Sequence, residues 1–254
     1  MAWQGATRLM RLTGGVLDLV LPPRPLDPGL GGSVQTHGLS AKAWSRIAFI
    51  DPPACDGCGL PLGRMIDGIM RCAACLARPP AFDRARAACV YEDPVRDLIL
   101  AFKHGDRTDL AGLFALWLQR AAADLLPQAD AIAPVPLHPL RLLARRYNQA
   151  AEVARPLARL AGKPYFASPV VRRRRTLSQG GRSASGRRRN VAGAFEVPAS
   201  WTRRVAGRRI LLVDDVLTTG ATLEACARAL KAAGAAGVDV AVIARVRLAG
   251  MGLA

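Results

Sequence analysis

The sequence is poor in aromatic residues, which make up 5% of the chain, and its acidic residues are outnumbered by basic ones. Few aromatic rings leave little material for stacking on single-stranded bases, so any contact with nucleic acid is expected at the phosphate backbone, without sequence reading. No stretch approaches about 18 uninterrupted apolar residues, which predicts that no segment spans a membrane. No Gly-Lys-Ser or Gly-Lys-Thr occurs, which excludes a Walker phosphate loop.

The first 23 residues also lack the pattern of a secretory signal. Their apolar part, residues 16–21, is short and is interrupted by Asp18. A signal peptide needs a longer apolar region. We therefore expect a cytoplasmic protein.

The charge is strongly positive: 36 lysines and arginines stand against 19 acidic residues, for a net charge of +17. Such a charge suits a polyphosphate or a nucleic acid as ligand, although a compositional bias toward arginine and alanine would also produce part of it. The 254 residues, half of them apolar, suffice for one ordinary domain and a small additional module.

The most informative stretch is residues 210–222. An apolar run over residues 210–213 predicts a strand buried on both faces of a parallel sheet, and two carboxylates, Asp214 and Asp215, are expected to close it. A turn rich in threonine and glycine follows, and residues 223–231 are strong helix formers. An ordinary strand, turn and helix with two surface aspartates is the competing interpretation.

The order strand, turn and helix places backbone N–H groups and the positive end of a helix dipole at one point, which is a ready site for a phosphate monoester. Gly220 allows close approach, and Thr218, Thr219 and Thr222 add hydroxyl donors. The carboxylates can accept hydrogen bonds from vicinal ribose hydroxyls, with a divalent cation nearby. A sugar with a 5-phosphate and free 2- and 3-hydroxyls fits this pattern, which resembles the phosphoribosyl-pyrophosphate (PRPP) signature of type I phosphoribosyltransferases.

Four cysteines form a second motif, Cys55-x2-Cys58 followed by Cys72-x2-Cys75. This spacing is typical of two knuckles that close one tetrahedral structural zinc site. Disulfides are the main alternative and fit a cytoplasmic chain poorly. The other two cysteines, at positions 89 and 226, have no partner at ligand spacing and are expected to be small buried residues.

A weak repeat precedes this motif, because residues 21–30 align with residues 51–60, with prolines where the cysteines stand. Ser40 and Ala43 then correspond to the second cysteine pair, and Trp44 corresponds to Leu76. Two interpretations stay open, a zinc ribbon that has lost its metal and a proline-rich linker. We predict an N-terminal segment over residues 1–50, a zinc ribbon over 51–86 and a phosphoribosyltransferase-like domain over 87–250.

The remaining chain alternates strands and helices, which predicts an α/β fold with a parallel sheet and helices on both faces. Strands are expected at residues 87–91, 131–135, 170–171 and 238–244. One helix is expected to start at Pro94, with Asp93 as its cap, and to run to residues 103–106. Others are expected at residues 110–126 and 150–160.

Two basic segments of this domain are candidates for the site. The loop after residues 131–135 carries Arg145 and Arg146 and is expected to face residues 214–222, because ligands bind at the carboxyl ends of parallel strands. Residues 172–190 form a basic loop rich in glycine and serine. It is either a cationic flap that closes on a polyanion or a solvated charge run.

As a whole the chain resembles the ComF family of competence-associated proteins, which join zinc ribbons to a phosphoribosyltransferase domain. The resemblance rests on these matching segments: Cys55/Cys58/Cys72/Cys75 with residues 59–62, residues 102–103, 135–137, 146–150, 175–179, 187–195 and 213–222. It implies PRPP binding and, in some members, a role in the uptake or processing of DNA in transformation. One departure is Arg146, which stands where the family usually has glycine.

Two functions remain in contention. An enzyme would bind PRPP with magnesium and transfer the ribosyl group to an acceptor, and carboxylates would stabilise the oxocarbenium-like transition state. A non-catalytic module would bind single-stranded DNA or partners such as DNA-uptake or helicase proteins, and its PRPP loop would be a nucleotide sensor or a relic.

The predicted catalytic residues are Asp214, Asp215, Lys103 and Arg146. The predicted PRPP-binding residues are Asp214, Asp215, Thr218, Thr219, Gly220, Ala221, Thr222, Arg145, Gln149, Arg175 and Gln179. The predicted zinc ligands are Cys55, Cys58, Cys72 and Cys75.

Overall fold

The structure is a computed structural model in which the chain divides into two compact units, residues 1–46 and residues 47–254. The described residues are 39–63, 70–104, 107–137, 142–143, 145–173 and 193–247. In this part of the chain, no helix combines the length and the apolar character that crossing a bilayer requires.

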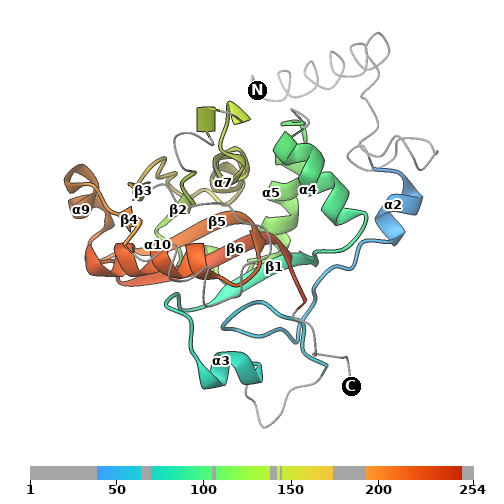
Figure 1. Ribbon diagram of the computed structural model, residues 1–254, viewed down its shortest axis with the longest axis horizontal. Coiled ribbons are helices and arrows are strands. Elements are labelled where there is room, and N and C mark those ends of the chain that lie inside the picture. The colour runs from blue at the N-terminus through green and yellow to red at the C-terminus, as the bar shows by residue number, and fades with distance from the viewer. Residues whose placement is uncertain are drawn as a thin grey trace, which may run out of the picture. The chain divides into compact units, whose positions relative to one another are not determined.

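A four-stranded parallel sheet is the centre of the larger unit (Figure 1). Its strands lie in the order β1 (Ala85–Val90), β6 (Gly237–Arg245), β5 (Arg209–Leu217) and β2 (Ala131–Pro134). Parallel neighbours require crossover connections, and helices make them here. The predicted α/β class with a parallel sheet is confirmed.

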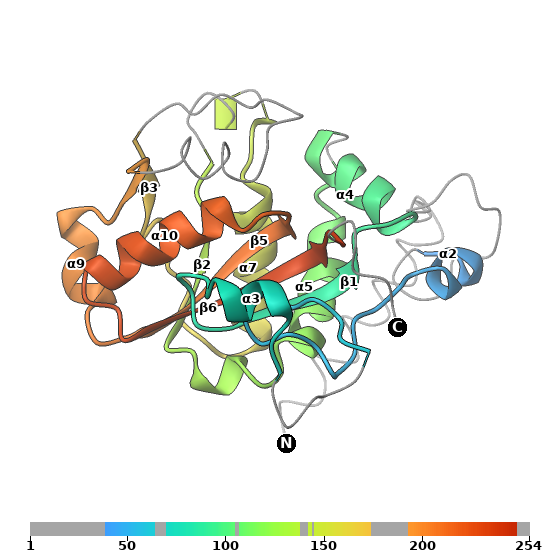
Figure 2. The same cartoon turned by 60° about the horizontal axis from the view of Figure 1, so that its bottom comes forward.

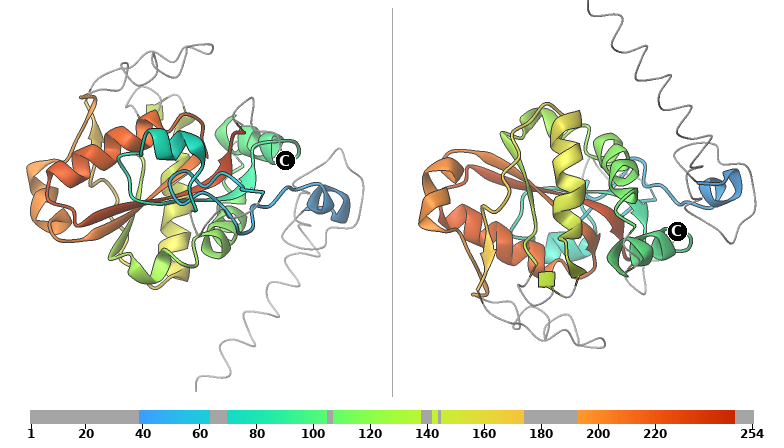
Figure 3. Two further views of the ribbon diagram at one scale, coloured as in Figure 1. Left: turned by 90° about the horizontal axis from the view of Figure 1, so that it is seen from below. Right: turned by 90° about the horizontal axis from the view of Figure 1, so that it is seen from above.

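Helices cover both faces of the sheet. Helix α10 (Ala221–Ala232) and the short helix α3 (Ala73–Ala77) lie on one face (Figure 2; Figure 3, left). Helix α7 (Gln149–Leu160) lies on the other face (Figure 3, right), where it packs against α5 (Leu110–Ala121). The strands between these layers are buried along most of their length because both faces are covered, as the apolar runs of the sequence predicted.

The structure corrects the predicted end of β5. The sequence suggested that Asp214 and Asp215 close the strand, but β5 continues to Leu217. The reason is its neighbour, since β6 stays paired with β5 up to the register pair Leu217–Arg245. The carboxylates therefore lie inside a hydrogen-bonded strand, which holds their backbone more firmly than a loop would.

Several helix boundaries also differ from the predictions. Helix α4 (Val95–His104) begins one residue after Pro94. Helix α5 ends at Ala121 and not at Leu126, where a 3-10 helix (Leu126–Gln128) containing Pro127 begins. Proline lacks an N–H group, so an α-helix cannot continue normally through this position.

Two further elements complete the larger unit. Strands β3 (Val171–Arg172) and β4 (Phe195–Glu196) form a separate antiparallel pair, so the strand predicted at residues 170–171 lies outside the parallel sheet. Helix α9 (Ala199–Val205) follows β4. Residues 48–50 pair with the outer edge of β1 through hydrogen bonds between Ile50 and Ala88 and between Val90 and Ala48, which covers that edge.

The described part of the first unit contains helix α2 (Ala41–Ser45), which begins with the same backbone geometry as α3. The residue before α2 is Ser40, with φ −68° and ψ 153°, and the residue before α3 is Cys72, with φ −71° and ψ 158°. Ala43 and Cys75 are the buried residues of the two five-residue helices. This likeness supports the hypothesis of a metal-free ribbon, most of which lies outside the described residues.

Candidate functional site

Residues 218–220 lead from β5 directly into α10. We call residues 214–222, which also include the end of the strand and the first residues of the helix, the Asp/Thr loop. Gly220 precedes the helix with φ 75°, in the left-handed region that side chains other than glycine rarely adopt. Its carbonyl accepts the N–H of Glu224 at 2.8 Å, which starts the helix. The first N–H groups of an α-helix have no partner within the helix, so the N-terminus of α10 offers them to an anion.

The two carboxylates of the Asp/Thr loop face opposite sides of the sheet, because successive side chains of a strand alternate. Asp214 lies on the side of α10, where its charge acts on the Cys226 thiol. Burial, together with the negative charge of Asp215, raises the pKa of Asp214 to about 7. The backbone N–H of Asp215 donates to the Asp214 carboxylate at 2.9 Å. The site therefore extends across the carboxyl edge of the sheet.

On the other side of the sheet, Asp215 forms an ion pair with Lys103. The Nζ–carboxylate distance is 3.0 Å, and the two side chains are only 17% and 16% exposed. Lys103 is the penultimate residue of α4. It precedes Asp215 by about 110 residues in the sequence. The structure thus brings the predicted lysine directly to the predicted carboxylate.

Residues 145–149 hold the end of α4, and with it Lys103, in place. The Tyr147 hydroxyl donates to the carbonyl of Phe102, and the Gln149 amide donates to the carbonyl of Lys103 at 3.4 Å. Arg145 donates to the Gln149 side chain at 3.2 Å. Gln149 is 1% exposed, so in this structure it supports Lys103 and does not face solvent.

Arg146 is exposed and has φ 64°. This left-handed conformation costs a residue with a Cβ atom roughly 1 kcal/mol. This cost gives a physical reason for the glycine that usually stands at this position in the family that the chain resembles. The two other predicted ligand-binding residues, Arg175 and Gln179, lie outside the described residues, as does most of the basic loop over 172–190.

Sequence reasoning gave no specific role to two charged residues near the site. Arg172, in β3, is close enough that its charge favours the ionised form of Asp214, and its guanidinium lies 5.3 Å from the centre of the Phe195 ring. Arg245 ends β6 and contacts the start of the Asp/Thr loop. In the sequence, only its position at the end of an apolar strand could have drawn attention to Arg245.

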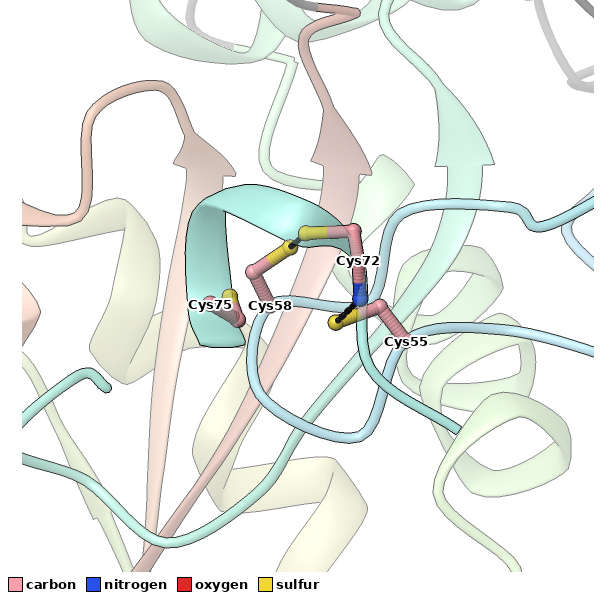
Figure 4. Close-up of side chains that lie close together, drawn as sticks. All are labelled: Cys55, Cys58, Cys72 and Cys75. Atoms are coloured by element: carbon pink, nitrogen blue, oxygen red, sulfur yellow. Dashed lines mark hydrogen bonds between the residues drawn. The ribbon is translucent and has the colours of Figure 1, made fainter. Parts of the chain in front are cut away.

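Cys55, Cys58, Cys72 and Cys75 converge on one point, and we call them the cysteine cluster (Figure 4). Their four sulfur atoms lie within 4.8 Å of one another, and all four residues are buried and free of disulfides. The Sγ atoms of Cys58 and Cys72 are 3.8 Å apart. This matches the edge of a tetrahedron with metal–sulfur bonds of about 2.3 Å, the zinc–thiolate length.

Local contacts shape the cysteine cluster for a metal. The backbone N–H of Cys72 donates to Cys55 Sγ at 3.2 Å (Figure 4), and the N–H groups of Cys58 and Gly59 turn back to the Cys55 carbonyl. A Cβ atom at Gly57 would lie 3.0 Å from Cys75 Sγ. Only glycine therefore fits beside the sulfur atoms without displacing them.

Without a cation, the thiols compete for negative charge. Hydrogen bonds from Cys58 and Cys75 lower the pKa of Cys55, and the reciprocal bond raises the pKa of Cys58 to about 11. A divalent cation removes this competition by accepting all four residues as thiolates. The donor set fits zinc. As predicted, the two other cysteines, Cys89 and Cys226, are fully buried.

The cysteine cluster lies next to the Asp/Thr loop. A cavity of about 190 Å³ between them is lined by Cys58 and Cys75 on one side and by Thr218, Thr219 and Gly220 on the other. The two motifs, separated by about 140 residues in the sequence, are therefore neighbours in the fold.

A parallel sheet with an Asp/Thr loop at its carboxyl edge defines a phosphoribosyltransferase-type domain, here joined to a four-cysteine module. Residues 148–249 match the family described as phosphoribosyl transferase domain. The chain is 33% identical over 208 residues to the DNA utilization protein YhgH of Escherichia coli strain K12, covering 79% of this chain and 88% of the relative. It is 33% identical over 217 residues to Competence protein F of Haemophilus influenzae, covering 84% and 92%.

The chain therefore belongs to the competence protein F (ComF) family. A solved structure, the orotate phosphoribosyltransferase of Aeropyrum pernix, is 21% identical and covers 59% of this chain and 66% of its own, with a TM-score of 0.34.

Proposed function

We propose that this protein binds PRPP or a related ribose 5-phosphate ligand together with Mg²⁺, and that it serves DNA uptake in natural transformation or DNA repair. The phosphoribosyl transferase domain match supports the ligand class. The relatives called DNA utilization protein and Competence protein F support the biological role. The cytoplasmic location, and DNA-uptake or helicase proteins as partners, stay predictions.

The observation that carries the ligand proposal is the ion pair between Lys103 and Asp215 beside the start of α10. At this sheet edge, the Lys103 cation and the Asp215 carboxylate, proposed as the acceptor for ribose hydroxyls, lie beside the backbone N–H groups of the first turn of α10. Thr218, Thr219 and Thr222, between the carboxylates and the first turn of α10, are the proposed ligands of the 5-phosphate. Lys103 and Arg145, with Arg146 and Arg175, are the proposed partners of the pyrophosphate group.

Magnesium would balance the charge of the pyrophosphate group, and the carboxylates of Asp214 and Asp215 would supply oxygen donors for it. If ribosyl transfer follows binding, these carboxylates also stabilise positive charge that develops at the anomeric carbon. Transfer itself is decided by an assay for pyrophosphate release with candidate acceptor bases. The ligand proposal does not depend on that result.

Calorimetric titration of Mg²⁺ and PRPP into the wild-type protein tests the proposal directly. We expect binding by the wild type and none by the double variant Asp214→Asn/Asp215→Asn. The matched control is Asp51→Asn, because Asp51 is an exposed carboxylate that pairs with Arg120 and is not part of the Asp/Thr loop. Failure of the folded wild type to bind would refute the proposal.

A second candidate, binding of single-stranded DNA, is favoured by the exposed arginines of α9. Arg203 and Arg204 are exposed, and the Arg204 guanidinium lies 4.4 Å from the centre of the Trp201 ring. With a net charge of +17, such a surface suits phosphate contacts. DNA affinity should then fall steeply with salt, survive Asp215→Asn and weaken when residues 172–175 are neutralised.

A further inference from the structure

Arg245 lies between the cysteine cluster and the Asp/Thr loop. It is the last residue of β6 and is only 3% exposed. Its guanidinium donates to the backbone carbonyls of Cys58 (3.1 Å), Leu217 (3.0 Å), Thr218 (2.8 Å) and Val246 (2.7 Å). One buried side chain therefore contacts a predicted metal ligand and the start of the predicted phosphate loop.

The charge of Arg245 is matched to the cysteine cluster and not to a carboxylate. No carboxylate of the described residues forms an ion pair with its guanidinium. A buried cation is costly unless negative charge or dipoles compensate it. Four thiolates around one divalent cation carry a net charge of about −2, which would supply that compensation.

On the loop side, Arg245 controls the direction of backbone N–H groups. A carbonyl and the N–H of the next residue belong to one planar peptide unit. Holding the carbonyl of Thr218 therefore orients the N–H of Thr219. The carbonyl of Leu217, which also accepts the backbone N–H of Val246 at 3.1 Å, orients the N–H of Thr218. These N–H groups stand at the start of the phosphate-binding turn.

We propose that Arg245 is a positioning residue that couples metal occupancy of the cysteine cluster to the shape of the phosphate-binding loop. The metal fixes the knuckle that carries the Cys58 carbonyl, this carbonyl fixes the guanidinium, and the guanidinium fixes residues 217–218. Loss of the metal should loosen the loop and weaken phosphate binding. This inference rests on the proposed function for its ligand, but the order of the loop can be measured without one.

The test compares the wild type with Arg245→Gln and Arg245→Lys, each with its metal and after chelation. The readouts are zinc content, affinity for ribose 5-phosphate by calorimetry, and hydrogen exchange at the amides of Thr218 and Thr219. In the wild type, chelation should lower the affinity about tenfold or more and speed exchange at both amides. Arg245→Gln should retain zinc, have low affinity already, and lose little more on chelation, because the connection is already broken.

A matched control separates this coupling from general loss of stability. Arg84→Gln removes a half-buried arginine that pairs with Asp239 near the opposite end of β6. It should lower stability but leave the response to chelation unchanged. Arg245→Lys keeps the charge and should fold even if Arg245→Gln does not, and its single ammonium group should restore the coupling only in part.

The proposal is overturned if Arg245→Gln binds ribose 5-phosphate like the wild type, or if chelation weakens both proteins equally. If the zinc-loaded wild type does not bind ribose 5-phosphate, the proposed ligand is wrong, and hydrogen exchange decides the coupling alone. Faster exchange of the Thr218 and Thr219 amides after chelation in the wild type only would then support the coupling. Unchanged exchange would refute it.

Discussion

The cysteine cluster and the Asp/Thr loop are neighbours in the fold but are assembled in different ways. The cluster draws its ligands from two short segments within about 20 residues, and its sulfur atoms compete for charge until a cation arrives. The loop presents N–H groups for an anion and obtains its lysine from α4. The difference shows that a convergent four-cysteine cluster can be encoded locally, whereas the proposed sugar-phosphate site needs the whole sheet to bring its parts together.

The largest expected effect comes from removing half of the cysteine cluster. Cys55→Ser with Cys58→Ser leaves two ligands, so bound zinc should be lost and the free energy of unfolding should fall by about 3 kcal/mol or more, because structural zinc supplies about 10 to 16 kcal/mol in small zinc peptides. Metal analysis and thermal unfolding measure both. Cys89→Ala is the control, since Cys89 is buried outside the cluster and its variant should keep the metal. Retention of zinc by the double variant would contradict the assigned ligands.

The next largest effect is expected in the Asp/Thr loop. Asp215→Asn removes the charge that pairs with Lys103 and weakens the acceptor for ribose hydroxyls. Affinity for Mg²⁺ and PRPP should fall about 100-fold, or ~3 kcal/mol, with zinc content unchanged. Calorimetry with parallel metal analysis checks both values. A loss of zinc would show that the two sites are less separate than their assembly suggests.

Asp214 should give a smaller effect with a characteristic pH dependence. Its pKa is raised from an ordinary 3.8 to about 7, so between these pH values the folded protein holds a proton that the unfolded chain has released. Stability should therefore decline as pH rises from about 4 to 7 and stay lower above 7. Asp214→Asn should remove this decline and exceed the wild type by about 1 to 2 kcal/mol at pH 8, but not at pH 4.

Urea unfolding at several pH values measures this difference. Asp51→Asn provides the reference for an exposed carboxylate and should show no such gain. Equal stability of Asp214→Asn and wild type at pH 8 would mean that Asp214 is better compensated than its surroundings indicate.

The smallest effect is expected at Arg146. Arg146→Gly relieves the positive φ of 64° but adds freedom to the unfolded chain, so the net gain in stability should be about 0.5 to 1 kcal/mol. Ligand affinity should fall because a proposed partner of the pyrophosphate group is lost. Arg146→Lys keeps the charge and the strain, and it should change neither quantity much. Chemical unfolding and calorimetry on both variants distinguish the two contributions, and a destabilised Arg146→Gly would show that the side chain makes compensating contacts.

Local patterns predicted much of this fold. The apolar run before Asp214 gave β5, the glycine and threonines gave the turn into α10, and the cysteine spacing gave the convergent cluster. These predictions succeeded because each depends on residues close in the sequence. The ends of β5 and α5 were missed: one is set by pairing with β6, and the other falls before a 3-10 helix that contains Pro127.

The sequence by itself determined the chemistry available to this protein: four thiolates at zinc spacing, two carboxylates before a Thr/Gly turn, and an excess of arginine. Only the tertiary structure decided that Lys103 meets Asp215, that residues 145–149 hold α4, and that Arg245 joins the two motifs. The physical reason is the separation in the sequence between the residues that interact. Turn geometry and ligand spacing act over a few residues, whereas these contacts form only when strands and helices far apart in the chain pack against one sheet.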